Sequence, residues 1–522
     1  MDMFLGHDMD TNTASAWSLA GWLISAEAVA CTWLISAAAA AWAAGRRRWL
    51  IVPLALLPVL PVVALAVLVI AVSTKGMLVP VVVPIIIATL ALIGALVVIV
   101  RTRKGCGWSA SRAGIMGAAV LALLVLTVHQ AAQASAFERS QISSRAIAAV
   151  IGLRPGMPSP EDNAAIDWQA LEPQLRSESV SAVMDRQDVR AWYRDGGSPP
   201  QDVDAVIKQL TPLFSGIERA AARPVLVMPR NHLNSLVAMQ LPEVTFARQA
   251  SRVLAIRSRM RSDAGDRVGA WQDVERMFRI AGQIAQDPLL IAQLVHAGIT
   301  VEAFAQAQRL TASGGAFGVR PQRTFPWQQR FALSLVCEEA MFMQAISEYA
   351  DGLFDAAITG SSTDVFVPPM LIDLYQIFAL PRELAAYRAA LNGARKASVD
   401  GLGSAMAYAK QIEQQAPRGY LASMCLPVLR VTCGNLAKAD AIHAVMIAAI
   451  TAQETRARTG AWPVAAEASW PMDPCTGKPL LTAVDGDRLR IWSFDSDLTD
   501  ENGAEFDKKT KKGDIALTIG PP

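Results

Sequence analysis

Four long apolar stretches in the first quarter of the chain constrain its fold more than any other feature. Each can cross about 30 Å of hydrocarbon as a helix that rises roughly 1.5 Å per residue. Several prolines interrupt the second and third stretches, which neighbouring helices in a membrane bundle can tolerate. The sequence therefore predicts a short tail and then four transmembrane helices, with the tail at residues 1–16, the membrane region at 17–135 and the spans at 17–44, 49–72, 77–100 and 113–134.

Lysine and arginine in the short loops predict the orientation of these helices, because loops rich in them stay in the cytoplasm. The first loop contains Arg46, Arg47 and Arg48, and the third loop contains four further basic residues. The second loop offers Lys75 alone, and the tail has neither lysine nor arginine. We therefore expect the tail, and after an even number of spans the large following domain, to lie outside the cytoplasm.

Glu27 lies inside the first apolar stretch. A carboxylate within the hydrocarbon is costly and often marks a pathway for ions or protons. Alternatively, the span begins near Ala28, which still leaves enough residues to cross the bilayer and places Glu27 at its interface. Both interpretations stay open at this point.

The charge of the chain beyond the spans argues against one class of function. Residues 1–135 hold eight of the 48 basic and four of the 46 acidic side chains, so 40 basic and 42 acidic side chains follow. Nucleic-acid binding depends on clustered lysine and arginine, which release counterions from the phosphates. A near-neutral domain lacks that feature, and we expect no nucleic-acid partner.

The residues after the spans show a helical, amphipathic pattern, which predicts a mainly α fold with a large extracytoplasmic domain at 136–434. The clearest apolar stripe comprises Trp271, Val274, Met277, Phe278 and Ala281, at spacings of three and four. Segments rich in glycine, proline and serine separate the helical stretches. Further helices are predicted at 200–221, 244–261, 289–310, 327–353, 369–397 and 402–415.

The last stretch, residues 435–522, predicts a helix packed on a small antiparallel meander. A helix at 435–459 should end at Gly460, which is followed by Pro463. Two strands at 480–484 and 488–494 are joined by Asp485-Gly486-Asp487, a strong hairpin signal. A third strand is expected at 514–519.

Four short motifs in this stretch carry a family resemblance. They are Gly460-Ala461-Trp462-Pro463, Asp473-Pro474-Cys475-Thr476-Gly477-Lys478-Pro479-Leu480, Ile491-Trp492-Ser493-Phe494-Asp495 and Gly513-Asp514-Ile515. Together they resemble the C-terminal half of the major pseudopilins of type II secretion. The whole chain is also similar to membrane-anchored bacterial envelope proteins with such a tail, which implies a multi-pass protein of the bacterial inner membrane. A pseudopilin begins with one cleavable apolar helix, whereas this chain begins with four spans, so we do not expect filament assembly.

The resemblance also implies calcium binding, because pseudopilin tails of this kind hold calcium in an acidic loop. The corresponding residues are Asp495, Asp497, Asp500, Asn502 and Asp514. Oxygen ligands on a flexible loop suit calcium, although the spacing is not that of an EF-hand. The alternative is a solvated acidic loop balanced by the lysines at 508, 509, 511 and 512.

Four of the six cysteines fall in the expected extracytoplasmic domain, where disulfides can form. Pro427 lies between Cys425 and Cys433 and can turn the chain so that these two cysteines meet. Cys337 lies in an apolar helical stripe, which also fits a buried thiol. A Cys425–Cys433 disulfide and unpaired thiols are therefore both open.

The chain lacks the short motifs that mark common enzymes. It contains no HExxH or CxxC pair, no phosphate-binding GxxxxGK[ST] loop and no GxSxG elbow. His296 and His443 fall within apolar helices, as histidines of a protein core do. We therefore assign no catalytic residue, while a site assembled from distant positions stays an alternative.

Three functions follow, from different classes. The first is a non-enzymatic envelope protein, anchored in the lipid bilayer, whose helical scaffold presents the pseudopilin-like module to envelope or secretion proteins. The second is a transporter or channel component, a homo-oligomer that uses the proline-rich spans and Glu27. The third is an enzyme whose site forms only in the folded extracytoplasmic domain.

Overall fold

The computed structural model describes residues 156, 158–228, 241–312, 326–359, 380–415, 428–504 and 512–521. The chain divides into two compact units, Met1–Ser143 with Ile346–Ala385 and Ser144–Ala345 with Ala386–Pro522. The four predicted spans and Glu27 lie outside the described residues, so the membrane topology stays a prediction. The features below belong to the second unit, except for the described residues 346–359 and 380–385, which belong to the first.

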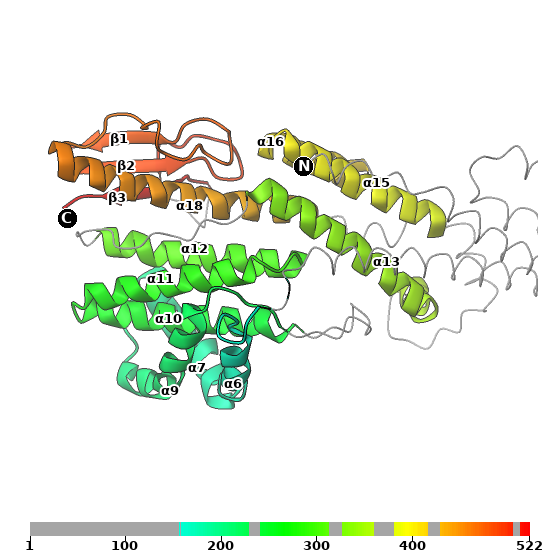
Figure 1. Cartoon of the computed structure of the whole chain (residues 1–522), viewed down its shortest axis with the longest axis horizontal. Coiled ribbons are helices and arrows are strands. Elements are labelled where there is room, and N and C mark those ends of the chain that lie inside the picture. The colour runs from blue at the N-terminus through cyan, green and yellow to red at the C-terminus, as the bar shows by residue number, and fades with distance from the viewer. Residues whose placement is uncertain are drawn as a thin grey trace, which may run out of the picture. The chain divides into compact units, whose positions relative to one another are not determined.

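Helices dominate the described residues, and a small antiparallel sheet lies near the C-terminus, which confirms a mainly α fold at this level (Figure 1). The predicted helix at 402–415 appears with those bounds, whereas most other ends shift by a few residues. The elements are α6 (Ala165–Leu175), α7 (Glu178–Asp185), α8 (Gln187–Asp195), α9 (Val203–Ala222), α10 (Pro242–Asp263), α11 (Arg267–Ile284), α12 (Leu290–Ala312), α13 (Trp327–Thr359), α15 (Leu380–Val399), α16 (Leu402–Gln415), α18 (Val428–Thr459), β1 (Leu481–Asp485), β2 (Arg488–Ser493) and β3 (Ile515–Ile519).

Local signals in the sequence explain where several helices begin and end. The Asp266 side chain accepts a hydrogen bond from the Gly269 N–H at 2.9 Å and so caps the start of α11. Pro242 occupies the first turn of α10, where its missing N–H costs nothing. Gly196 ends α8 with φ +78°, and Gly460 follows α18 with φ +79°, a conformation that favours glycine.

Helices α10, α11 and α12 pack on one another and form the centre of the helical part. All five residues of the predicted stripe on α11 are buried, from Trp271 to Ala281. Helices α6 and α9 pack together beside them, and α9 also contacts α11. The spacing of apolar residues therefore placed the core face of α11 correctly.

Helix α18 packs against three parts of the fold. They are α12, α16 and the sheet, which it contacts through β2 and β3 (Figure 1). The sheet has the order β1-β2-β3, with both pairs antiparallel and Leu481 opposite Trp492 in the hairpin. Helix α18 begins at Val428 rather than at residue 435, because its first turns also bury apolar side chains such as Leu429. The sheet and the helical layers thus share one hydrophobic core.

Among the described helices, α12 and α18 are long and apolar enough to cross a membrane by length and composition. However, 67% of the most apolar window of α12 and 72% of that of α18 are buried inside the protein. Burial in the core accounts for their composition, since core helices of water-soluble domains have the same character.

Candidate functional site: the acidic loop after β2

Asp514 is the centre of the acidic loop. Its Oδ2 atom accepts hydrogen bonds from the backbone N–H groups of Glu501 (3.0 Å) and Gly503 (2.8 Å), and its own N–H donates to the Ala504 carbonyl (2.7 Å). These three bonds tie the start of β3 to the loop that follows β2. The residue is 2% exposed, so its carboxylate is removed from bulk water.

Two carboxylate oxygens in this loop are buried without a hydrogen-bond partner. They are Oδ1 of Asp514 and Oε2 of Glu501. Burial, helped by the neighbouring charges of Glu501 and Asp500, raises the pKa of Asp514 to about 6, against the effect of the two N–H donors. An unpartnered buried carboxylate is costly, and either a proton or a cation relieves that cost.

The remaining predicted ligands lie in different surroundings. Asp500 accepts hydrogen bonds from the Trp492 indole (3.1 Å) and from the Asn502 N–H (2.8 Å). Asn502 adopts φ +59° and thereby turns the chain toward Asp514. Asp497 Oδ1 accepts a hydrogen bond from the Thr499 N–H at 3.1 Å. Asp500 and Asp514 therefore belong to the same part of the loop, and Glu501 joins them.

Asp495 is engaged elsewhere. Its Oδ2 forms an ion pair with Lys438 Nζ of α18 at 2.5 Å, and its Oδ1 accepts from the Ser496 N–H at 2.6 Å. Within the described part of the chain, no three His, Cys, Asp or Glu side chains already form a metal-binding group. Calcium binding therefore remains a proposal, for which Asp500, Glu501 and Asp514 are the residues that fit. Glu501 was missed because the resemblance assigned no role to its position.

The Asp473 turn explains why the second motif of the resemblance has its particular residues. Asp473 Oδ1 accepts hydrogen bonds from the Cys475 N–H (2.9 Å) and the Ser493 hydroxyl (2.6 Å), while Oδ2 accepts from the Thr476 hydroxyl (2.8 Å). Gly477 adopts φ +70°. These contacts fix the turn before β1 onto the end of β2, next to the start of the acidic loop.

The disulfide predicted between Cys425 and Cys433 stays a prediction, because the structure describes only the second of these two cysteines. Cys433 is an unpaired, buried thiol inside α18, with its Sγ 3.3 Å from the Arg430 carbonyl oxygen and 3.4 Å from Met406 Sδ. Burial raises the pKa of this thiol to about 11, which keeps it protonated and inert. The helix begins after Pro427 and directs the thiol into the core. Cys425 lies outside the described residues.

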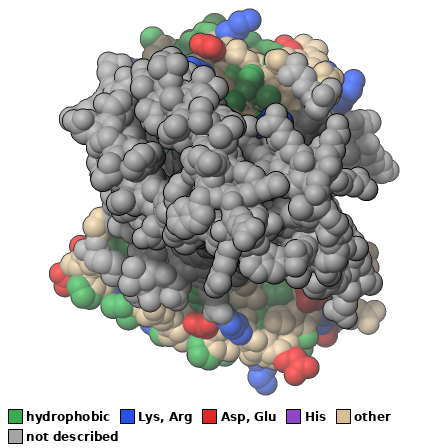
Figure 2. Space-filling model, turned by 90° about the vertical axis from the view of Figure 1, so that its right-hand side faces the viewer, with side chains coloured by type: hydrophobic (Ala, Val, Ile, Leu, Met, Phe, Trp, Pro, Cys, Tyr) green, Lys and Arg blue, Asp and Glu red, His purple; other side chains and the backbone are tan. Residues whose placement is uncertain are grey.

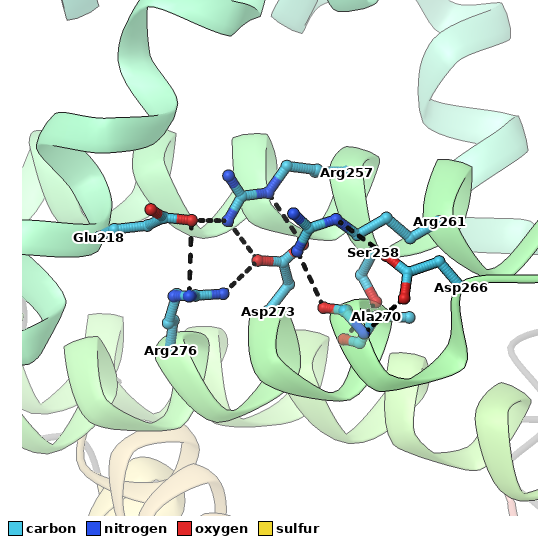
Figure 3. A network of polar contacts seen from close by, with 9 residues as sticks. Glu218, Arg257, Ser258, Arg261, Asp266, Ala270, Asp273 and Arg276 are labelled. Carbon is cyan, nitrogen blue, oxygen red and sulfur yellow. Dashed lines mark hydrogen bonds and ion pairs between the residues drawn. The ribbon is translucent and has the colours of Figure 1, made fainter. Parts of the chain in front are cut away.

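A buried ionic cluster joins α9, α10 and α11 (Figure 3). Asp273 is fully buried and contacts Arg257, Arg261 (3.0 Å) and Arg276 (2.9 Å), while Glu218 accepts from Arg257 at 2.9 Å. The Arg257 guanidinium also lies over the Phe214 ring, 4.5 Å from its centroid. Arg261 also pairs with Asp266 at 3.6 Å, so three arginines are paired with three carboxylates between packed helices. We interpret this cluster as structural, because its charges are used in holding the helices together.

Where Figure 2 shows described side chains, at the upper and the lower edge of the view, acidic and basic side chains lie close together. Comparisons of the chain with protein-family models, with curated proteins and with solved structures found no match. The resemblance to pseudopilins therefore rests on the sequence motifs alone.

Proposed function

We propose that this protein is a non-enzymatic, membrane-anchored envelope protein that binds other envelope proteins through its C-terminal helix and sheet. The observation that carries the proposal is the double role of α18. One part of its surface packs against α12 and another against β2 and β3, so the sheet is held on the helical layers by a shared core. A scaffold that presents a module to partners requires such a fixed attachment.

The surface around the sheet has features that suit a protein partner. Strand β1 pairs with β2 on one side, and its other edge has no strand partner among the described residues. An open edge can accept an extended segment of another chain through backbone hydrogen bonds. Three large apolar side chains are also exposed in the same segment, namely Val464 (87%), Met472 (53%) and Val484 (43%).

The acidic loop would act as a calcium-dependent support for this surface. The unpartnered oxygens of Asp514 and Glu501, together with Asp500, are suitable ligands for a hard cation that prefers oxygen. A bound ion would neutralise the repulsion among these carboxylates and fix the connection between β2 and β3.

In-cell photocrosslinking tests the proposal. A photoreactive amino acid replaces Val484 on β1 in the full-length protein, and the matched control carries it at Val268, which is 72% exposed on α11. We expect reproducible crosslinks to one or more envelope proteins from position 484, identified by mass spectrometry, and weaker crosslinks from position 268. Crosslinks exclusively between copies of this protein, or equal yields at both positions, would contradict a partner surface at β1.

A further inference from the structure

Two histidines meet in the core where α12 packs against α18. The ring centroids of His296 and His443 lie 6.0 Å apart in an edge-to-face arrangement, and the Phe278 ring of α11 lies 5.7 Å from His443. His296 is 0% and His443 is 8% exposed. The pair therefore occupies the interface between the helical layers and the helix that supports the sheet.

The surroundings of both rings favour the neutral form. His296 Nδ1 lies 2.9 Å from the Ala281 carbonyl oxygen, so this nitrogen carries the hydrogen and Nε2 is left as an acceptor. Nε2 of His296 and Nε2 of His443 are both buried without a hydrogen-bond partner. A proton added at either atom would create an imidazolium with no acceptor for its new N–H.

The charges around the pair oppose such a proton. Arg330 of α13 is 3% exposed and pairs with Asp440 of α18, one turn before His443, while its other nitrogen lies 3.4 Å from Gln293 Oε1, one turn before His296. Asp440 is already used by Arg330 and by the Trp327 N–H at 2.6 Å. From α11, the Ala281 carbonyl and the Phe278 ring face the pair. The positive charge of Arg330 is therefore balanced by Asp440, whereas a protonated histidine beside it would have no carboxylate to pair with among the described residues.

We propose that the His296–His443 pair is an acid-sensitive joint, at which protonation releases α18 and its sheet from α12. Burial, with a smaller contribution from the charge of Arg330, lowers the pKa of His443 to about 3 and that of His296 well below its usual value of 6.5. Once α18 separates, each ring can return to a pKa near 6.5. The separated form then binds more protons than the closed form below that pH, so acidification favours separation.

The expected response is large. Between pH 7 and pH 4.5, each histidine favours the separated form by roughly a hundredfold if its closed-state pKa stays below 4.5, because the factor is set by protonation of the released ring. Two rings acting together multiply this effect. A protein outside the cytoplasm experiences the external pH, so the joint would release the sheet in acidic surroundings.

Distance measurements by pulsed electron resonance test the joint in the full-length protein. Spin labels on genetically encoded residues replace Ile291 of α12 and Val431 of α18, which are 44% and 54% exposed. A second pair of labels, at Thr245 of α10 and Val268 of α11, reports on the helical layers alone. From pH 7 to pH 4.5 we expect a longer and broader distance distribution for the first pair and no change for the second.

The variant His296→Gln/His443→Leu supplies the matched control. Glutamine can still donate to the Ala281 carbonyl, and neither new side chain titrates, so we expect the acid response to disappear. The other three histidines of the chain remain in this variant. If the double variant does not fold, each single variant should show a roughly hundredfold smaller shift in the closed-to-separated ratio.

Three results would overturn the proposal. The first is an unchanged distance between α12 and α18 at pH 4.5, and the second is simultaneous lengthening in both label pairs, which indicates general unfolding. The third is the same acid response in a folded histidine variant, which would assign the response to other groups.

Discussion

At the scale of single residues, the acidic loop shows how a carboxylate can weaken the fold that contains it. Asp514 accepts two backbone N–H bonds through one oxygen, while its other oxygen is buried without a partner. Because its pKa is raised to about 6, the folded state binds a proton here more tightly than the unfolded state. The contribution of Asp514 to stability is therefore present below about pH 4 and is lost as pH rises through 6.

This balance predicts a calcium effect that depends on Asp514. At pH 7.5, calcium should raise the thermal midpoint of the full-length protein. A free calcium concentration of 100 times the dissociation constant should raise the free energy of unfolding by about 2.7 kcal/mol. Asp514→Asn should abolish this response and raise the midpoint measured with a chelator. Asp485→Asn, at an exposed position on β1, is the control. Equal midpoints of the unmodified protein with calcium and with chelator would rule out the ion.

Residue contacts are also where prediction from sequence was weakest. The apolar stripe of α11 was readable because its members lie three or four positions apart. Arg330 and Asp440 are 110 positions apart, and Lys438 and Asp495 are 57 apart, so their pairing depends on the tertiary arrangement. The histidines were expected in the core and are buried there, but their proximity to each other had no signal in the sequence.

At the scale of elements, helix-to-helix distance depends on small residues at particular positions. Gly216 of α9 faces α6, and a Cβ atom added there would lie 2.4 Å from Leu171 Cδ2 and 2.9 Å from Leu171 Cγ. Gly298 of α12 is exposed, and a Cβ atom added there would have no neighbouring atom within 4 Å. Replacing glycine by alanine should therefore lower the stability at Gly216 and raise it at Gly298.

We expect Gly216→Ala to lower the stability by about 1–3 kcal/mol, because α6 and α9 must move apart or Leu171 must leave its rotamer. Gly298→Ala should raise it by about 0.5–1 kcal/mol through helix propensity. Denaturant unfolding followed by tryptophan fluorescence measures both. A stabilising Gly216→Ala would show that α6 and α9 are not in close contact.

Many element ends were predictable to within a few residues, but α13 extends to Thr359 instead of residue 353, and α6, α7 and α8 had no predicted counterpart. Helix α16 has the bounds that its periodicity indicates, and the Asp-Gly hairpin joins β1 to β2. The start of α18 was placed too late because residues 428–434 have few amphipathic signals of their own and are held by burial of side chains such as Leu429 and Cys433. Helix ends commonly differ by one or two residues even between structural definitions.

At the scale of the whole molecule, the basic loops predict which side of the membrane the described domain occupies. A reporter that is active only outside the cytoplasm, such as alkaline phosphatase, should be active when fused after Pro522. The same reporter fused after Cys106, in the third loop, should be inactive, and a fluorescent protein that folds only in the cytoplasm should show the reverse pattern. Activity of both phosphatase fusions, or of neither, would contradict four spans with the tail outside.

The double packing of α18 also has a consequence for the order in which the chain folds during synthesis. Helix α12 ends at Ala312, but the helix that covers it begins at Val428, more than a hundred residues later. While those residues are being synthesised, the surface of α12 that α18 will bury remains open to wrong contacts. The described domain can therefore complete its core only after the final stretch of the polypeptide has been made, and a chain truncated before that stretch would be open to proteases.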